Sequence, residues 1–224
     1  MKFVSGSGAI DGVAAIFYSL VPGNLARATQ RRLAQLTHAA LPMDAALVVD
    51  AGCGPGWLAI EFAKLRPRVR VIGVDLSPMM IRIARFNARR RMNVDMRVAD
   101  AASLSLDDGA ADMIVSAESM HHWRSPVAIL DEFHRVLKPG GRAWIFDGRT
   151  DFAPEDLRGW TLYGQRVPPR RALEFIRRIL SIHGFSNAEW EQRIPEWIHE
   201  SRFKTGIVTP LGIYRHIELV KSGS

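Results

Sequence analysis

The stretch VVDAGCGPG, residues 48–56, decides the fold of this chain. Three glycines at alternate positions follow a short apolar run and precede an amphipathic segment. Glycine allows a sharp backbone turn and a close approach to a ligand, because it has no Cβ. The unpaired N–H groups at the start of the following helix favour a polar or anionic ligand group. Since ligands of open α/β sheets bind at the carboxyl ends of strands, this loop predicts a ligand site.

Strand-like and helix-like segments alternate around this loop. Short apolar runs, typical of strands buried on both faces of a parallel sheet, are separated by amphipathic helical segments. Repeated strand–helix units of this kind predict an α/β fold with a doubly wound, mostly parallel sheet. We expect strands at 45–50, 69–75, 94–99, 112–116 and 142–147, and helices at 56–65, 78–91 and 126–138.

The segments on either side of this core have weaker patterns. Residues 24–41 are amphipathic and Pro42 follows them, so we expect a helix that ends there. Towards the C-terminus we expect a helix at 170–182 and β-strands near 186–193 and 213–221. The chain has no internal repeat and no linker long enough to separate two domains.

An acidic residue ends the strand that follows the glycine loop. Asp75 lies 19 positions beyond Gly56, where a carboxylate can accept hydrogen bonds from both hydroxyls of a ribose. The loop spacing is G-x-G-x-G, whereas dinucleotide-binding proteins have G-x-G-x-x-G. Asp50, just before the glycines, would repel a diphosphate but suits a nearby ammonium or sulfonium. These residues therefore predict a nucleoside cofactor that carries a cationic group.

With these residues in place, the sequence resembles the class I S-adenosylmethionine-dependent methyltransferases. It is most similar to the small-molecule branch, which includes methyltransferases of ubiquinone and menaquinone biosynthesis. The resemblance implies a Rossmann-like fold with a seven-stranded sheet, an N-terminal helical lid and variable C-terminal cap elements. The matching blocks are DAGCGPG at 50–56, Asp75, VADA at 98–101, DMIVS at 112–116, MHHW at 120–123 and LKPGG at 137–141.

The resemblance also implies a domain layout and a cofactor site. We expect one methyltransferase domain over residues 1–224, with a helical lid at 1–42, a cofactor-binding core at 43–148, and a substrate cap with the final strands at 149–224. The implied cofactor is S-adenosylmethionine. The loop glycines would surround its methionine end, Asp75 would hold the ribose, and Asp100 would contact the adenine. The implied cofactor-binding residues are Asp50, Gly52, Gly54, Gly56, Asp75, Leu76, Asp100, Ala101 and Ala117.

The candidate catalytic and acceptor-binding residues follow from the chemistry of this cofactor. Its sulfonium is already a strong electrophile, so the protein must mainly place a nucleophile and exclude water. His121 is the candidate general base, because imidazole titrates near neutral pH. Glu118 and His122 are candidate acceptor contacts from the same segment, and Tyr18 and Trp160 are candidates from the lid and the variable region. Capping of a turn for Glu118, and simple packing for Tyr18, are the alternatives. No metal is expected.

The composition excludes several classes of protein and leaves one open. The 224 residues are 47% hydrophobic and include a single Cys, which excludes a disulfide framework, a zinc ribbon and a cysteine-held iron–sulfur cluster. The formal net charge of +7 leaves an RNA methyltransferase as an alternative, through the helix face of Arg82, Arg85 and Arg89. We favour a solvated helix face, since no RNA-binding module accompanies it. A non-catalytic partner protein with this fold is the other alternative.

No segment predicts a membrane-spanning or secreted protein. The longest apolar run, Val13–Val21, has nine residues, whereas a bilayer span needs about 20. Asp11 precedes this run and no small-residue cleavage site follows it, which argues against a signal peptide. We therefore expect a cytoplasmic protein that acts on a small apolar or aromatic molecule, with neither nucleic acid nor a membrane as partner.

Overall fold

The structure is a computed structural model that describes residues 23–152 and 184–223. The core elements lie near the predicted bounds, except that β5 begins five residues before the strand predicted at 142–147 and includes the end of the helix predicted at 126–138. The strands are β1 (Leu47–Ala51), β2 (Arg70–Asp75), β3 (Val94–Val98), β4 (Ala111–Ala117), β5 (Leu137–Gly148), β6 (Ile207–Leu211) and β7 (Tyr214–Val220). The helices are α2 (Gly23–Ala40), α3 (Trp57–Leu65), α4 (Pro78–Ala88), α5 (Pro126–Val136), α7 (Asn187–Glu191) and α8 (Arg193–Glu200), with a 3-10 turn at Met120–His122.

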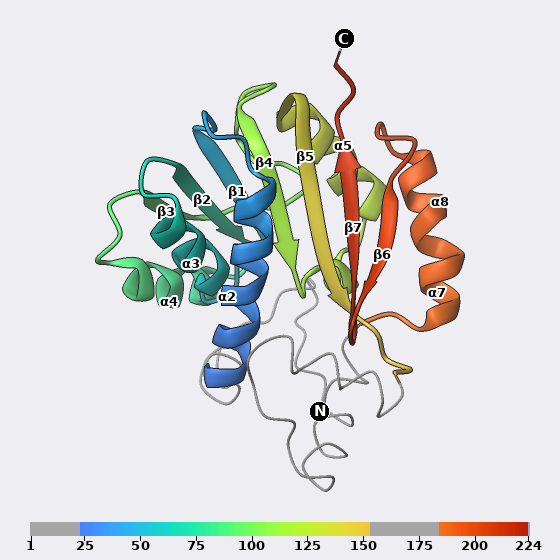
Figure 1. The fold of residues 1–224 in the computed structure, drawn as a ribbon, viewed down its shortest axis with the longest axis horizontal. Helices are drawn as coiled ribbons and strands as arrows, with labels where there is room; N and C mark the ends of the chain where they lie inside the picture. Colours follow the sequence, from blue (N-terminus) through green and yellow to red (C-terminus); the bar gives the residue numbers. More distant parts are fainter. Residues whose placement is uncertain (1–22, 153–183, 224) are drawn as a thin grey trace, which may run out of the picture.

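The strands form one seven-stranded sheet in the order β3-β2-β1-β4-β5-β7-β6 (Figure 1). The pairs from β3 through β5 are parallel, and β7 runs antiparallel to both β5 and β6. This topology confirms the predicted doubly wound, mostly parallel, seven-stranded α/β sheet. Because β3, β2, β1, β4 and β5 are parallel, their carboxyl ends meet at one edge of the sheet, which we call the carboxyl edge.

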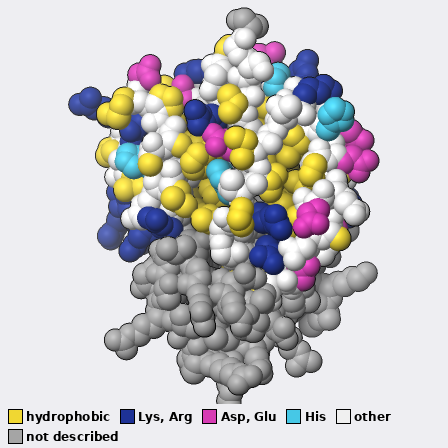
Figure 2. All heavy atoms as spheres, turned by 45° about the vertical axis from the view of Figure 1, so that its right-hand side comes forward, with side chains coloured by type: hydrophobic (Ala, Val, Ile, Leu, Met, Phe, Trp, Pro, Cys, Tyr) yellow, Lys and Arg dark blue, Asp and Glu magenta, His cyan; other side chains and the backbone are white. Residues whose placement is uncertain are grey.

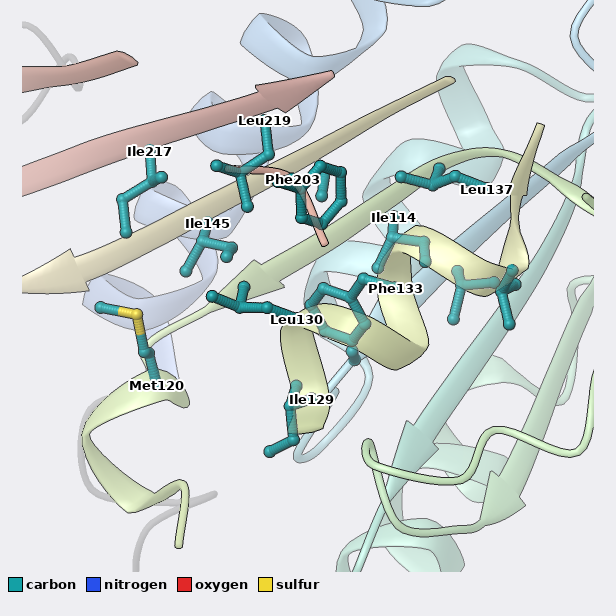
Figure 3. Close-up of a cluster of buried hydrophobic side chains, with 14 of the residues drawn as sticks. Ile114, Met120, Ile129, Leu130, Phe133, Leu137, Ile145, Phe203, Ile217 and Leu219 are labelled. Atoms are coloured by element: carbon teal, nitrogen blue, oxygen red, sulfur yellow. The ribbon is translucent and has the colours of Figure 1, made fainter. Parts of the chain in front are cut away.

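Helices cover both faces of the sheet and bury a separate cluster on each. Val48 of β1 lies in the cluster with α2, α3 and α4, whereas the next residue, Val49, lies in the cluster with α5, α7 and α8. This alternation follows from the two-residue period of a strand. Figure 3 shows the second cluster, where Phe133 of α5 lies among strand residues that include Ile114 and Ile145.

The prediction of a β-strand near residues 186–193 is wrong, because α7 and the start of α8 occupy this stretch. Ser186 caps α7: its Oγ accepts from the Glu189 N–H at 3.3 Å, and the Glu189 carboxylate accepts from the Ser186 N–H at 3.0 Å. The buried side chains lie four residues apart, a helical spacing: they are Trp190, Ile194 and Ile198. The strand predicted at 213–221 is confirmed as β7, and the helix predicted at 170–182 lies outside the described residues.

Aromatic rings line the face of β5 and β7 that carries Trp144. The imidazole of His216 stacks on Phe146 at 4.7 Å between ring centroids, and Trp144 meets the same imidazole edge-on at 4.5 Å. Burial lowers the pKa of His216 to about 4, so this imidazole is neutral near pH 7. Figure 2 shows hydrophobic side chains gathered on the side of the molecule where β5, β7 and β6 lie.

Candidate active site

The glycine loop turns sharply beneath the end of β2. The N–H groups of Gly52 and Cys53 both donate to the Val74 carbonyl oxygen, at 2.8 and 2.9 Å. This paired contact fastens the loop to the carboxyl edge. Gly52 and Gly56 have φ angles of 74° and 80°, which lie in the left-handed region that side chains disfavour. Glycine is therefore required by the backbone at both positions.

The three glycines face different surroundings. A Cβ on Gly52 would lie 2.0 Å from Ser119 Oγ, so the loop touches the segment that follows β4. A Cβ on Gly56 would lie 2.7 Å from the methyl carbon of Met96, so the lack of a side chain here lets the start of α3 pack closely against β3 and α4. A Cβ on Gly54 would meet nothing within 4 Å among the described residues. The middle glycine thus faces the open side of the loop, where a ligand can approach the backbone.

Asp50 lies beneath the loop and binds the first turn of α3. Its carboxylate accepts from the Ala59 N–H at 3.1 Å, in the first turn of that helix, and its side chain is buried. Burial, with a smaller contribution from the negative charge of Asp75, raises the pKa of Asp50 to about 7. The structure therefore gives Asp50 a role in fixing the loop, and its predicted contact with the cofactor stays a prediction.

The predicted ribose and adenine contacts lie at the ends of β2 and β3. The Asp75 carboxylate accepts from the Gly54 N–H and the Ser77 N–H, both at 2.9 Å, which places it directly against the open side of the loop. The neighbouring Leu76 is exposed. Asp100 is also exposed and accepts from the N–H two residues on at 2.9 Å, while Ala101 is half-buried. All four predicted contacts share the carboxyl edge with the glycine loop.

Glu118 follows Ala117 at the end of β4 in a strained backbone conformation. Its φ of 56° is in the left-handed region although it is not glycine, and strain of this kind gathers at functional sites. Its carboxylate accepts from the Tyr214 hydroxyl at 2.6 Å and from the Gln30 side-chain amide at 3.3 Å. Burial raises the pKa of Glu118 above its ordinary value. The Gln30 amide oxygen is buried and has no partner among the described residues, so this cluster can accept a hydrogen bond from a ligand.

His121 forms a buried pair with Asp147, the penultimate residue of β5. The imidazole Nδ1 lies 2.8 Å from Asp147 Oδ1, and the His121 N–H donates to Asp147 Oδ2 at 3.1 Å. The exposed fractions of the two side chains are 10% and 0%. Since a carboxylate only accepts, Nδ1 carries the proton and Nε2 is the basic nitrogen. Enzymes with a His–Asp pair hold the imidazole of their general base in the same way.

The electrostatics of the pair favour proton uptake by His121. Burial lowers the pKa of its imidazole. The negative charge of Asp147, the hydrogen bond to Asp147 and the charge of Glu118 together raise that pKa by more than burial lowers it. The net shift is upward from the ordinary histidine value. His122 lies beside the pair, with ring centroids 4.0 Å apart, and it is half-buried.

Sequence reasoning missed Asp147, Tyr214 and Gln30 as site residues. Asp147 was recognised only as the end of a strand, although an acid at the carboxyl end of β5, next to β4, was the available signal. Tyr214 and Gln30 gave no signal, because antiparallel pairing of β7 and packing of α2 bring them to this edge. Tyr18 and Trp160, the candidate acceptor contacts, lie outside the described residues.

The site therefore combines three features at one edge of the sheet: the glycine loop, the Asp75 carboxylate at a position suited to a ribose, and the His121–Asp147 pair. This donor set fits S-adenosylmethionine, because Gly54 leaves room for the ligand and Asp75 lies at the strand end from which acids reach a ribose. Across 23–152 and 184–223, no group of three or more His, Cys, Asp or Glu is placed to hold a metal ion. The fold is Rossmann-like, and the glycine loop and Asp75 lie where such folds hold a nucleoside.

Comparison with known proteins identifies the family. Residues 48–141 match the family described as methyltransferase domain, so this part of the chain is a class I S-adenosylmethionine-dependent methyltransferase domain. The chain is 33% identical to demethylmenaquinone methyltransferase from Thermus thermophilus over 135 residues, which cover 60% of this chain and 59% of that protein. It is 34% identical to ubiquinone biosynthesis O-methyltransferase from Xanthomonas oryzae over 109 residues, which cover 48% and 45%.

A solved structure of an S-adenosylmethionine-dependent methyltransferase from Aquifex aeolicus shares the fold. It aligns with a TM-score of 0.64 at 19% identity, covering 86% of this chain and 89% of that one. The chain spans less than two thirds of the length of the two curated relatives described above. Family membership implies S-adenosylmethionine as the cofactor. No helix among the described residues is long and apolar enough to cross a membrane.

Proposed function

We propose that this protein transfers a methyl group from S-adenosylmethionine to a small-molecule acceptor, with the His121–Asp147 pair as general base. The observation that carries the proposal is the 2.8 Å contact of this pair at the same edge as the glycine loop. A base is of use only for an acceptor that must lose a proton as it is methylated, such as one with a hydroxyl group. The buried pair also argues against a non-catalytic partner protein, which has no need of a positioned base.

The residues of the site divide the work. Bound S-adenosylmethionine supplies an electrophilic methyl group. Gly52, Gly54 and Asp75 would hold the cofactor against the ends of β1 and β2. His121 Nε2 takes the acceptor proton, and Asp147 holds the imidazole in the tautomer that allows it. Glu118 fixes α2 and β7 around the acceptor side through its contacts with Gln30 and Tyr214.

The acceptor we propose is small and apolar or aromatic. The two relatives support this, since their names describe methylation in menaquinone and ubiquinone biosynthesis. The exposed arginines of α4 do not favour an RNA acceptor, because α4 starts at the carboxyl edge and leads away from it towards the start of β3. An RNA acceptor would have to cover both the carboxyl edge and the length of α4.

Cofactor binding is tested by calorimetry with S-adenosylmethionine and S-adenosylhomocysteine. Asp75→Ala should weaken both affinities by about 10- to 100-fold, because it removes hydrogen bonds to a charged group. Asp107→Ala is the matched control, since Asp107 is an exposed acid in the loop before β4. Absence of binding to the wild-type chain, or equal loss in the two variants, would overturn the proposal.

Catalysis is tested by screening metabolite extracts with cofactor labelled in the methyl group. A labelled product identifies the acceptor, and His121→Gln should then lower turnover by about 10²- to 10⁴-fold without changing cofactor affinity. His199→Gln removes an exposed histidine of α8 and should leave turnover unchanged. If His121→Gln methylates the acceptor as fast as the wild type does, the general-base assignment fails.

A further inference from the structure

Three loops meet at the edge of the sheet opposite the carboxyl edge. They lead from α2, α3 and α4 into β1, β2 and β3. The Arg66 guanidinium donates to the Pro42 carbonyl oxygen and to Met43 Sδ, which joins the first two loops. The Asn93 amide donates to the carbonyl oxygens of Val69, at 3.0 Å, and Arg66 in the second loop and of Ala63 at the end of α3, which joins the second loop to the third. We call these loops and the outer side of α4 the amino-edge surface.

The segment that supplies most of the amino-edge surface, residues 64–97, is strongly basic. Residues 64–97 contain ten Lys and Arg against two Asp, a net charge of +8, whereas the complete chain has +7. Asp95 pairs with two of the arginines, at 3.4 and 2.8 Å, Asp75 lies at the other edge, and Asp44 is an exposed acid of the first loop. Within residues 64–97, the basic side chains with no carboxylate of a described residue within 4.0 Å are Arg66, Arg68, Arg82, Arg85, Arg89, Arg90 and Arg91.

The same surface exposes large apolar side chains. Phe86 on α4 is 65% exposed, and Met92, in the loop after it, is 98% exposed. Met43 and Leu65, from the first and second loops, are exposed as well. Half of the large apolar side chains exposed in the described residues therefore lie among this concentration of arginines. Exposed apolar side chains next to a concentration of basic groups are typical of surfaces that lie on a membrane.

We propose that the amino-edge surface docks onto the face of an anionic lipid bilayer. Guanidinium groups bind lipid phosphates, and each basic residue near an anionic membrane adds to the attraction. The exposed apolar side chain of Met92 enters the boundary between headgroups and acyl chains, as apolar side chains do in proteins that lie on a membrane. We favour a lipid bilayer over RNA as the partner, because methionine and leucine side chains insert into a bilayer but offer no face on which a nucleic-acid base can stack. The aromatic ring of Phe86 is already covered by Arg89, at 4.2 Å.

Docking by this edge has a direct consequence for the orientation of the enzyme. Strands of five to seven residues separate the two edges by roughly 20 Å, so the cofactor loop faces water while the amino edge meets lipid. The acceptor then reaches the site from solution. Surface contact of this kind is distinct from a membrane span, so the proposal departs from the sequence-based expectation of no membrane partner but agrees with the lack of a spanning helix in the described residues.

The test is sedimentation of the intact protein with vesicles of equimolar phosphatidylcholine and phosphatidylglycerol at low ionic strength. The double variant Arg90→Gln/Arg91→Gln should partition at least about tenfold less than the wild type. Met92→Gln should reduce partitioning about tenfold through loss of apolar insertion. The control Arg202→Gln/Lys204→Gln removes the same charge from exposed positions beyond α8 and should partition as the wild type does. High salt should release the wild type, because exposed charges are screened.

Several results would overturn the proposal. These are no partitioning of the wild type into the anionic vesicles, equal partitioning into pure phosphatidylcholine, or equal loss in the two double variants. Tighter binding of a single-stranded RNA oligonucleotide than of vesicles would assign the surface to nucleic acid. None of these readouts uses the cofactor, so failure here is distinguishable from failure of the methyltransferase proposal. Thermal unfolding at the wild-type temperature confirms that each variant is folded.

Discussion

Replacing Asp147 with asparagine is the sharpest perturbation of the proposed base. The carboxylate accepts three hydrogen bonds, from His121 Nδ1 at 2.8 Å, the His121 N–H at 3.1 Å and the Gly148 N–H at 2.7 Å. Asparagine has one oxygen and one NH₂ group, so in either orientation a backbone N–H faces another donor. A buried donor left without an acceptor costs about 1–3 kcal/mol. We expect Asp147→Asn to lower the free energy of unfolding by that amount.

The same substitution should change the titration of His121. The charge that raises the pKa of this imidazole is removed while its burial remains, so the pKa should fall. A base acts in its deprotonated form, so the acid limb of the rate profile should move to lower pH. Turnover at the plateau should fall by about 10²- to 10⁴-fold, because an NH₂ group beside Nδ1 favours the wrong tautomer.

NMR of protein labelled with ¹⁵N in histidine measures this pKa without any acceptor. Comparison with His121→Gln assigns the signal of His121. His216 is an internal reference, since burial holds its pKa at about 4 and it stays neutral over the range in which His121 titrates. If the pKa of His121 is the same in Asp147→Asn and in the wild type, the reasoning about this pair is refuted.

Three further substitutions test the loop, the core and a helix cap. Gly52→Ala should weaken S-adenosylhomocysteine binding in calorimetry at least about tenfold, because its Cβ would overlap Ser119; Gly109→Ala shares the positive φ but has open space around its Cβ, and should bind normally. Phe133→Ala should cost about 3–5 kcal/mol in denaturant unfolding, and a loss below about 1 kcal/mol would contradict its place in the core. Ser186→Ala should cost about 1 kcal/mol in the same assay, since it removes the cap of α7; an unchanged midpoint would show that the cap contributes nothing.

The central half of the fold was predictable because its signals are local. The residues of each apolar strand and of the glycine loop lie close together in the sequence. A local signal also marks the start of α4, where Ser77 Oγ accepts from the Met80 N–H at 3.2 Å. The stretch at 186–193 misled because it contains apolar residues at strand-like intervals, whereas the Ser186–Glu189 capping box was the stronger signal. Strand β6 gave no pattern, since it is an edge strand that contains Pro210 and is largely exposed.

The candidate site also has a part that local sequence signals reveal and a part that they do not. The cofactor side follows from one loop and one acid, so Gly54 and Asp75 could be named from their spacing. The acceptor side is assembled by pairing between β4, β5 and β7, which sequence spacing does not reveal. Asp147 therefore escaped notice, although His121 beside it was recognised.

The contact between Gly52 and Ser119 has a consequence for how this site can change over evolutionary time. Ser119 immediately precedes the turn that carries His121, and the loop that contacts it is the one expected to hold the cofactor. A bulkier residue at either position must displace the other, so the two segments can vary only in concert. Libraries aimed at a new acceptor through this turn should therefore include position 52, because selecting for specificity alone would also select against cofactor affinity.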